Sequence, residues 1–302
     1  MFVDYRGSLR GVLQWQWRPI LLYVAVSTIV VVLDRFELVQ RIRISALPLA
    51  IVGGAIGIFV SFRTNSAYDR WWEGRRLWGT LINASRHLAT QALCYVAPRG
   101  EDGKALAHRV VRRHIAYVHV LRCLLRTQDP LKDEEAIAFL SEDERRDLEG
   151  DSNMTHALLQ QQAADLVAFA DAGKLEERRL QSMDETLRVI LDVQGGCERI
   201  KKTPMPRGYG YFAELLIRTF GFLLPLGLVA DHHVLTIPIT VLVCLAFTLI
   251  SEVGRVLEDP FTMFWPALPL SALAKTIEIN LRERLGEKGL PPLPKPVDGI
   301  LM

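Results

Sequence analysis

Histidine, cysteine and carboxylate side chains are the groups of this chain that could hold a metal ion or take part in catalysis. His108, His114 and His119 follow one another at spacings of six and five residues, so they do not share one face of a helix. His232 and His233 are adjacent. The sequence has none of the HExxH, GxSxG or P-loop patterns of metalloproteases, hydrolases and nucleotide-binding enzymes. The spacing therefore predicts neither a metal site nor catalysis.

The four cysteines, Cys94, Cys123, Cys197 and Cys244, are scattered and form no CxxC pair. This spacing argues against a zinc site and indicates no disulfide framework. We expect reduced and mostly buried thiols, because a free thiol behaves as a small apolar group. The formal net charge of +2, with acidic and basic residues mixed, does not suggest a nucleic-acid partner.

The apolar residues are concentrated in four uncharged or nearly uncharged segments, at about 19–33, 44–62, 211–230 and 234–250. A helix needs about 20 residues to cross the core of a bilayer, so the first segment is short for a span. Trp15, Trp17 and Tyr23 could anchor its start at the membrane interface. The segments predict a multi-pass membrane protein with four transmembrane helices, of which the last two form a tight helical hairpin separated by the polar residues 231–233.

Two charged residues, Glu214 and Arg218, lie inside the third apolar segment. Being four residues apart, they share one face of a helix. A single charge is costly in lipid, so we expect them to pair with each other or to face protein. Structural pairing is favoured over a role in transport chemistry.

The long stretch between the second and third segments, residues 63–210, has apolar residues at the three- and four-residue spacing of helices and no strand-like alternation. Asp129-Pro130 and Gly173 predict breaks, and Ser141 with Glu144 resembles a capping box. The fold class predicted is therefore all-α, with a helical cytoplasmic region that also includes residues 252–302.

Positive charge near the first segment sets the expected orientation. Arg6, Arg10 and Arg18 precede that segment, which favours a cytoplasmic N-terminus, and an even number of spans returns the C-terminus to the same side. Arginines in the following loop oppose this assignment: Arg35, Arg41 and Arg43.

The second segment could line a pore. Gly54, Ile58 and Phe62 are spaced by four and form one stripe of a helix, while Gly53 and Gly57 form a small-residue pair on a neighbouring face. Such a stripe is ordinarily a helix-packing surface. Here, however, no proline occurs between residues 49 and 79, so the helix is expected to continue unbroken from lipid into the charged residues beyond. Such a continuous rod could line a pore first with membrane residues and then with soluble ones.

Four sequence elements carry a family resemblance. FRTNSAYDRWWEGRRLWG at 62–79 resembles the signature of the bestrophin channels, in which an apolar pore helix runs into an Arg-Trp-Trp sequence. QGGCERIKKTPMP at 194–206, EDPF at 258–261 and IEINLRERLGE at 277–287 are similar to other parts of that family, the last to its bacterial members. The elements occur in order and with consistent spacing over nearly the whole chain.

This resemblance implies a homopentameric ion channel with one central pore, four membrane helices per subunit and a helical cytoplasmic domain. By distance from Arg70, the pore neck falls on Gly54, Ile58 and Phe62; the family usually has a bulkier residue where this chain has Gly54. A second constriction at the cytoplasmic exit would fall on Leu175, which could equally be a packed helix residue. An apolar neck gates by wetting and cannot select the sign of an ion.

The resemblance also sets expectations for partners and location. We expect a homopentamer in the bacterial inner membrane passing small monovalent inorganic ions, with anions such as chloride favoured and cation selectivity as the alternative. A non-conducting scaffold and an enzyme are further alternatives. The residues after Pro260-Phe261 lack the acidic cluster of animal members, so we expect no calcium clasp and no cofactor. Arg70, Trp71 and Trp72 could couple gating or anchor the interface, with the anchoring role favoured.

The proline-rich tail at 290–302 is expected to be extended. It could fold back as a latch near the pore exit or remain free.

Overall fold

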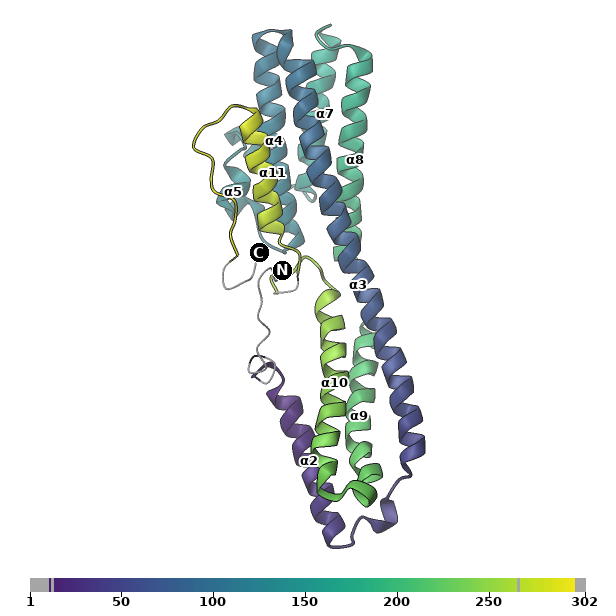
Figure 1. Ribbon diagram of the computed structural model, residues 1–302. Coiled ribbons are helices and arrows are strands. Elements are labelled where there is room, and N and C mark those ends of the chain that lie inside the picture. The colour runs from purple at the N-terminus through teal and green to yellow at the C-terminus, as the bar shows by residue number, and fades with distance from the viewer. Residues whose placement is uncertain (1–10, 12–13, 265–266, 297–302) are drawn as a thin grey trace. The chain divides into compact units, whose positions relative to one another are not determined.

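The computed structural model describes residue 11, residues 14–264 and residues 267–296, and the regular elements among them are all helices, as predicted (Figure 1). The chain divides into two compact units. We call them the apolar unit, formed by Pro204–Glu258 and the described part of Tyr5–Trp71, and the polar unit, formed by Trp72–Thr203 and the described part of Asp259–Met302.

The apolar unit holds the predicted membrane segments. Its helices are α2 (Trp17–Arg35), the first part of α3 (Ala46–Gln91), α9 (Arg207–His232) and α10 (Thr236–Leu257). By length and composition, three stretches of the described chain could cross a membrane, and the third of these contains both α9 and α10. The turn His233–Leu235 separates these two helices, with His233 in the left-handed region at φ 47°, so the predicted helical hairpin is confirmed (Figure 1).

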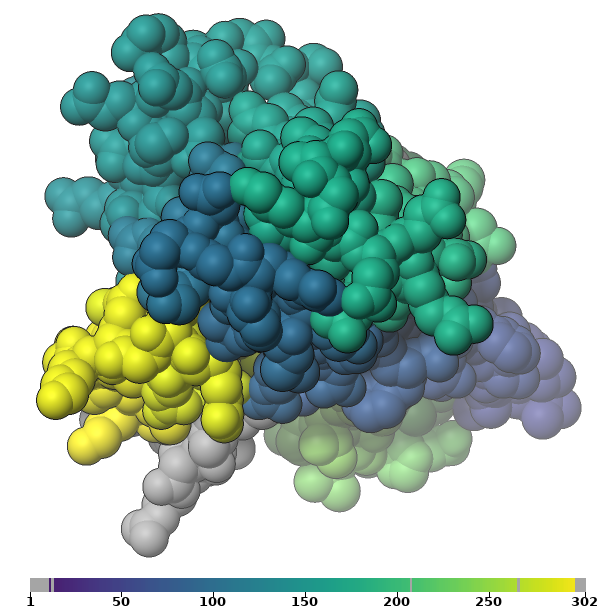
Figure 2. Space-filling view, turned by 90° about the horizontal axis from the view of Figure 1, so that it is seen from above, coloured from purple at the N-terminus to yellow at the C-terminus, as the bar shows by residue number. Residues whose placement is uncertain are grey.

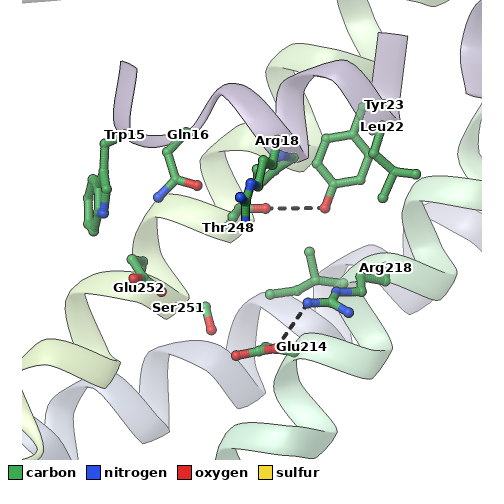
Figure 3. Close-up of a pocket in the computed structure, with 12 residues that line it drawn as sticks. Trp15, Gln16, Arg18, Leu22, Tyr23, Glu214, Arg218, Thr248, Ser251 and Glu252 are labelled. Atoms are coloured by element: carbon green, nitrogen blue, oxygen red, sulfur yellow. Dashed lines mark hydrogen bonds and ion pairs between the residues drawn. The ribbon is translucent and has the colours of Figure 1, made fainter. Parts of the chain in front are cut away.

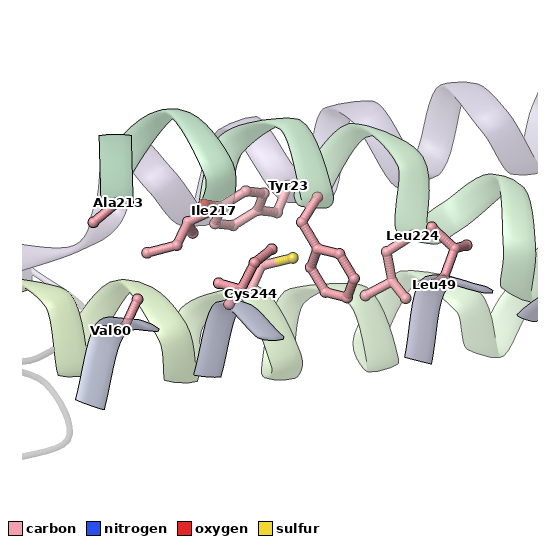
Figure 4. Close-up of a cluster of buried hydrophobic side chains, with 9 residues drawn as sticks. Tyr23, Leu49, Val60, Ala213, Ile217, Leu224 and Cys244 are labelled. Carbon is pink, nitrogen blue, oxygen red and sulfur yellow. The ribbon is translucent and has the colours of Figure 1, made fainter. Parts of the chain in front are cut away.

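Apolar side chains from all four helices fill the core of the apolar unit. Tyr23 comes from α2, Ile56 and Val60 from α3, Phe220 from α9 and Cys244 from α10 (Figure 4). Their burial fixes which face of each helix is turned inward. This packing decides which side of α3 is left uncovered.

The predicted role of the small residues on α3 is also observed. A Cβ atom on Gly53 would lie 3.0 Å from Cζ of Phe220, and one on Gly57 would lie 3.5 Å from Cε1 of Phe247. The two aromatic rings are themselves in edge contact, with centroids 5.8 Å apart. The absence of side chains at 53 and 57 therefore lets α3 approach α9 and α10 closely.

The polar unit is a bundle built around α4 (Glu101–Leu125), which is buried along most of its length. Around it are the end of α3, the helix α5 (Glu134–Ile137), α7 (Met154–Asp171), α8 (Glu177–Lys202) and α11 (Leu270–Arg284). In Figure 2 the yellow C-terminal segment lies against the blue and teal helices, in agreement with the packing of α11 on α4.

Local signals place the ends of these helices. Ser141 and Glu144 form the predicted capping box at the start of α6 (Glu142–Leu148). Asp129 accepts a hydrogen bond from the backbone N–H of Leu131, and Gly173 takes φ 73° just after α7. After Gln91 the chain changes from α-helix into a π-helical turn, Ala92–Val96.

The structure describes only part of the proline-rich tail, so the latch hypothesis stays a prediction. Residues 291–296 have no regular secondary structure, and residues 297–302 lie outside the described residues. Arg6 and Arg10, on which the predicted orientation rests, also lie outside them.

Candidate functional site

The candidate neck residues lie on the uncovered face of α3. Ile56 and Val60 point into the core of the apolar unit. Ile58 and Phe62, in contrast, are 61% and 68% exposed, and a Cβ atom added to Gly54 would meet nothing within 4 Å. An exposed apolar stripe on a helix whose other face is packed needs a further partner or a role.

The rotation of α3 at the end of this stripe is fixed by Arg63. This side chain is 3% exposed and donates from Nη2 and Nε to Oε1 of Glu258, at 2.7 and 3.1 Å. Its Nη1 donates to Oγ of Ser251 at 3.0 Å. Because consecutive residues point in different directions around a helix, an inward Arg63 leaves the preceding Phe62 on the uncovered side.

Glu258 also contacts Arg70, the next candidate residue, which lies two turns further along α3. Arg70 donates from Nε to the backbone carbonyl of Glu258 at 3.1 Å, and Tyr68 stacks on Trp71 with ring centroids 6.1 Å apart. Trp72 belongs to the polar unit and is about half exposed. Arg70 therefore has a structural contact of the kind expected for an anchoring residue.

Leu175, the candidate for the second constriction, is 5% exposed within the polar unit. Its neighbour Lys174 is exposed, pairs with Asp102 at 2.6 Å and lies over the ring of Phe169. A residue that narrows a pore must project from its subunit. The burial of Leu175 therefore favours the alternative interpretation, a packed residue just before α8.

The C-terminal motif at 277–287 supplies a buried charge network rather than a site. Glu278 is buried and accepts hydrogen bonds from His119 at 3.0 Å, Lys275 at 2.7 Å and Arg282 at 2.9 Å. Burial alone would raise the pKa of Glu278, but these three hydrogen bonds outweigh it and hold the pKa at about 2. The network joins α11 to α4.

The acidic residues of the EDPF motif have local partners. Glu258 binds Arg63, as described above, and Asp259 pairs with Lys201 at 2.7 Å and accepts a hydrogen bond from the backbone N–H of Phe261. Across the described ranges, no three histidine, cysteine or acidic side chains are grouped so that they could hold a metal ion.

The histidines of α4 do not converge. His108 is exposed, whereas His114 and His119 are buried and bind different partners. Nε2 of His114 lies 2.8 Å from Oγ of Ser85, and burial lowers the pKa of His114 to about 3. This imidazole is therefore a neutral hydrogen-bonding group of the interior.

The cysteines are free, and three of the four are buried, the exception being Cys94. Burial raises the pKa of Cys197 to about 12, so this thiol stays protonated. The predicted pair inside the third apolar segment is also present, with Glu214 and Arg218 3.2 Å apart.

The residue that sequence reasoning missed is Arg63. An arginine directly after an apolar run is usually assigned to the aqueous side, and its partner Glu258 lies 195 residues away. The one available signal is that a carboxylate, Glu258, follows the fourth apolar segment. It would lie at the same level of the membrane as the arginine that follows the second segment.

Comparison with known proteins gives consistent matches over most of the chain. The family model described as Bacterial/Fungal Bestrophin protein matches residues 2–283. A voltage-dependent anion channel-forming protein of Mesorhizobium japonicum is 33% identical over 265 residues, which cover 88% of this chain and 83% of that protein. A protein with the same functional name from Escherichia coli is 34% identical over 250 residues, covering 83% of this chain and 80% of that one.

The fold agrees with this assignment. The crystal structure of a bacterial bestrophin homologue from Klebsiella pneumoniae matches with a TM-score of 0.83 at 30% identity, over 89% of this chain and 98% of that chain. The family and these relatives are membrane channels and not enzymes. The chain therefore belongs to the bestrophin family of ion channels.

Proposed function

We propose that five copies of this chain form a channel whose neck in the membrane consists of Gly54, Ile58 and Phe62. The observation that carries the proposal is the uncovered apolar stripe of α3, because in a closed ring of identical subunits such stripes can meet on the symmetry axis. The number five is taken from the family resemblance.

The neck acts as a barrier through its lack of polar groups. Rings of Ile58 and Phe62 offer an ion neither charge nor hydrogen bonds, so a narrow neck excludes water and opens by wetting. With no side chain at Gly54, the constriction is shorter or wider at that end. Arg63 and Arg70 hold the lining helix in its rotation through Glu258, and Trp71 and Trp72 lie near the end of the membrane segment as anchors.

For the permeant ion we propose small monovalent anions such as chloride. The support is the relatives, which are named as anion channel-forming proteins. Since the neck is uncharged, anion preference would come from helix N-termini or backbone amides facing the pore.

Cation selectivity is the second candidate, and one observation favours it. Asp69 is exposed and follows Phe62 by seven residues, so it lies on nearly the same face of α3. Five such carboxylates below the neck would attract cations.

We further propose that the channel spans the inner membrane of a bacterium with both termini in the cytoplasm, and that it works without calcium. The pairing of Glu258 with Arg63 and of Asp259 with Lys201 supports the latter, because those carboxylates already have cationic partners.

Reversal potentials in planar bilayers under a KCl gradient test the proposal. A shift of the reversal potential towards the chloride potential supports anion permeation. A shift towards the potassium potential would establish the cation alternative if Asp69→Asn reduces it and the control Asp231→Asn does not. Absence of any current from correctly assembled protein would favour a scaffold. Added calcium should leave the open probability unchanged.

A further inference from the structure

A pocket with a cavity volume of about 360 Å³ opens within the apolar unit (Figure 3). Its walls come from the chain entering α2 and the first turns of that helix, the early turns of α9 and the last turns of α10. The volume lies in the range of roughly 300–1,000 Å³ that is usual for small-molecule sites. The pore-lining stripe of α3 contributes no residue to it.

Charged side chains of both signs line this pocket. Arg218 and Glu214 pair at 3.2 Å, yet the two side chains remain 64% and 48% exposed. They lie two and three turns inside α9, a helix apolar enough to cross a membrane. Lipid tails cannot satisfy such exposed charges, so a polar group has to cover them.

Arg18 supplies a second cation. Its guanidinium lies 5.4 Å from the ring of Trp17, and among the described residues it takes part in no ion pair, since the carboxylates of the lining pair with other arginines. Figure 3 shows Arg18, Arg218 and Glu214 directed into the space between the three helices. Glu252, also in the lining, is bound by Arg255, which is not part of the lining.

The remaining wall is apolar. Leu22 and Ile217 line it together with the ring of Tyr23, whose hydroxyl lies 3.2 Å from Oγ1 of Thr248. Trp15 of the lining and Trp17, which follows in the chain but is not part of the lining, are about half exposed, as is usual for residues at the level of lipid headgroups. A site with charges on one side and apolar walls on the other fits an amphipathic ligand.

We propose that this pocket binds the headgroup of an aminophospholipid. The phosphodiester lies against Arg18 and Arg218, because guanidinium groups form paired hydrogen bonds with phosphate oxygens. The primary ammonium donates to Oε1 of Glu214, the oxygen that does not accept from Arg218, and the glycerol and upper acyl chains lie against the apolar wall. A choline headgroup carries the same net charge but has no N–H to donate, so it binds more weakly.

Lipid titration of the purified full-length channel, followed by native mass spectrometry, tests this inference. The probes are phosphatidylethanolamine, phosphatidylcholine and phosphatidylglycerol, with glycerophosphoethanolamine and inorganic phosphate as soluble competitors. We expect phosphatidylethanolamine to bind most tightly and the soluble phosphates to compete only weakly, because they lack the acyl chains.

Matched variants locate the binding. Arg18→Gln should weaken phosphatidylethanolamine binding about tenfold, the usual effect of losing a charge-assisted hydrogen bond. Arg35→Gln, an exposed arginine at the other end of the same helix, should have no effect. Glu214→Gln should reduce the preference for ethanolamine over choline headgroups. If Arg18→Gln does not assemble, Arg18→Lys, which keeps the positive charge, is measured in its place.

Three outcomes would overturn the inference. If all lipids bound equally and Arg18→Gln did not change their binding, the lipids would only be solvating the apolar unit nonspecifically. If inorganic phosphate displaced bound phosphatidylethanolamine as effectively as another lipid does, the pocket would be a site for soluble anions. Absence of any lipid from the assembled channel would assign the pocket to a contact with another copy of the chain. None of these depends on whether, or to which ion, the protein conducts.

Discussion

Arg63 and Glu258 form a largely buried ion pair, with Nη2 of the arginine 2.7 Å from Oε1 of the glutamate. The pair joins the residue directly after Phe62 on α3 to the residue directly after α10. It thereby fixes the rotation of α3 at the point where the apolar stripe ends. The side of α3 that faces away from the packed core is the side that carries Ile58 and Phe62.

Loss of this ion pair should destabilise the apolar unit. Arg63→Gln leaves Glu258 without its cationic partner, and breaking a buried pair in this way costs about 3 kcal/mol. We expect the melting temperature of the detergent-solubilised protein to fall by several degrees. Arg43→Gln is the control, because the pair of Arg43 with Asp34 is more exposed and worth less than about 1 kcal/mol. Equal melting temperatures for the two variants would show that Arg63 does not fix the helix.

Two adjacent glycines of α3 should respond oppositely to a larger side chain. Gly54→Ile adds atoms where nothing lies within 4 Å, so we expect folded protein with a longer apolar neck and a conductance lower by at least about twofold. Gly53→Ile forces atoms against Phe220, where a Cβ alone would already approach to 3.0 Å, so we expect little assembled protein. Size-exclusion yield and single-channel recordings measure these effects. Normal assembly of Gly53→Ile would contradict the observed packing.

His114 should make the polar unit less stable as the pH falls. Its pKa is about 3 in the folded protein, because of burial, and about 6.5 in an unfolded chain. Between these values the unfolded state binds one more proton, so stability is lost as the pH falls through this window, by up to about 1.4 kcal/mol per pH unit.

Thermal melts between pH 7 and pH 5 measure this dependence; His114→Gln should flatten the profile, and His108→Gln, at an exposed position, should not. Parallel profiles for wild type and His114→Gln would mean that folding does not change the pKa of His114.

Much of the helical architecture could be predicted from the sequence, because it depends on local patterns. The absence of proline from residues 50–78 indicated a helix running through Phe62, and α3 does extend to Gln91. The charges between the third and fourth segments marked the hairpin, and Ser141 with Glu144 marked the start of α6.

Features that depend on distant partners could not be predicted in the same way. Arg63 looks like a solvent-facing arginine until Glu258 is placed beside it, and Leu175 cannot be recognised as buried from its exposed neighbours Lys174 and Glu176. The π-helical turn at Ala92–Val96 has no signal in the sequence that distinguishes it from the α-helix before it.

The central claim is that the exposed stripe of α3 lines the pore, and single-channel recording of two phenylalanine variants tests it most directly. Phe62→Ala and Phe222→Ala remove the same atoms from exposed positions of the apolar unit, on α3 and α9 respectively. We predict that Phe62→Ala raises conductance or open probability by at least about twofold, because it widens the apolar neck, while Phe222→Ala matches the wild type. Wild-type currents from correctly assembled Phe62→Ala would contradict the assignment of the neck.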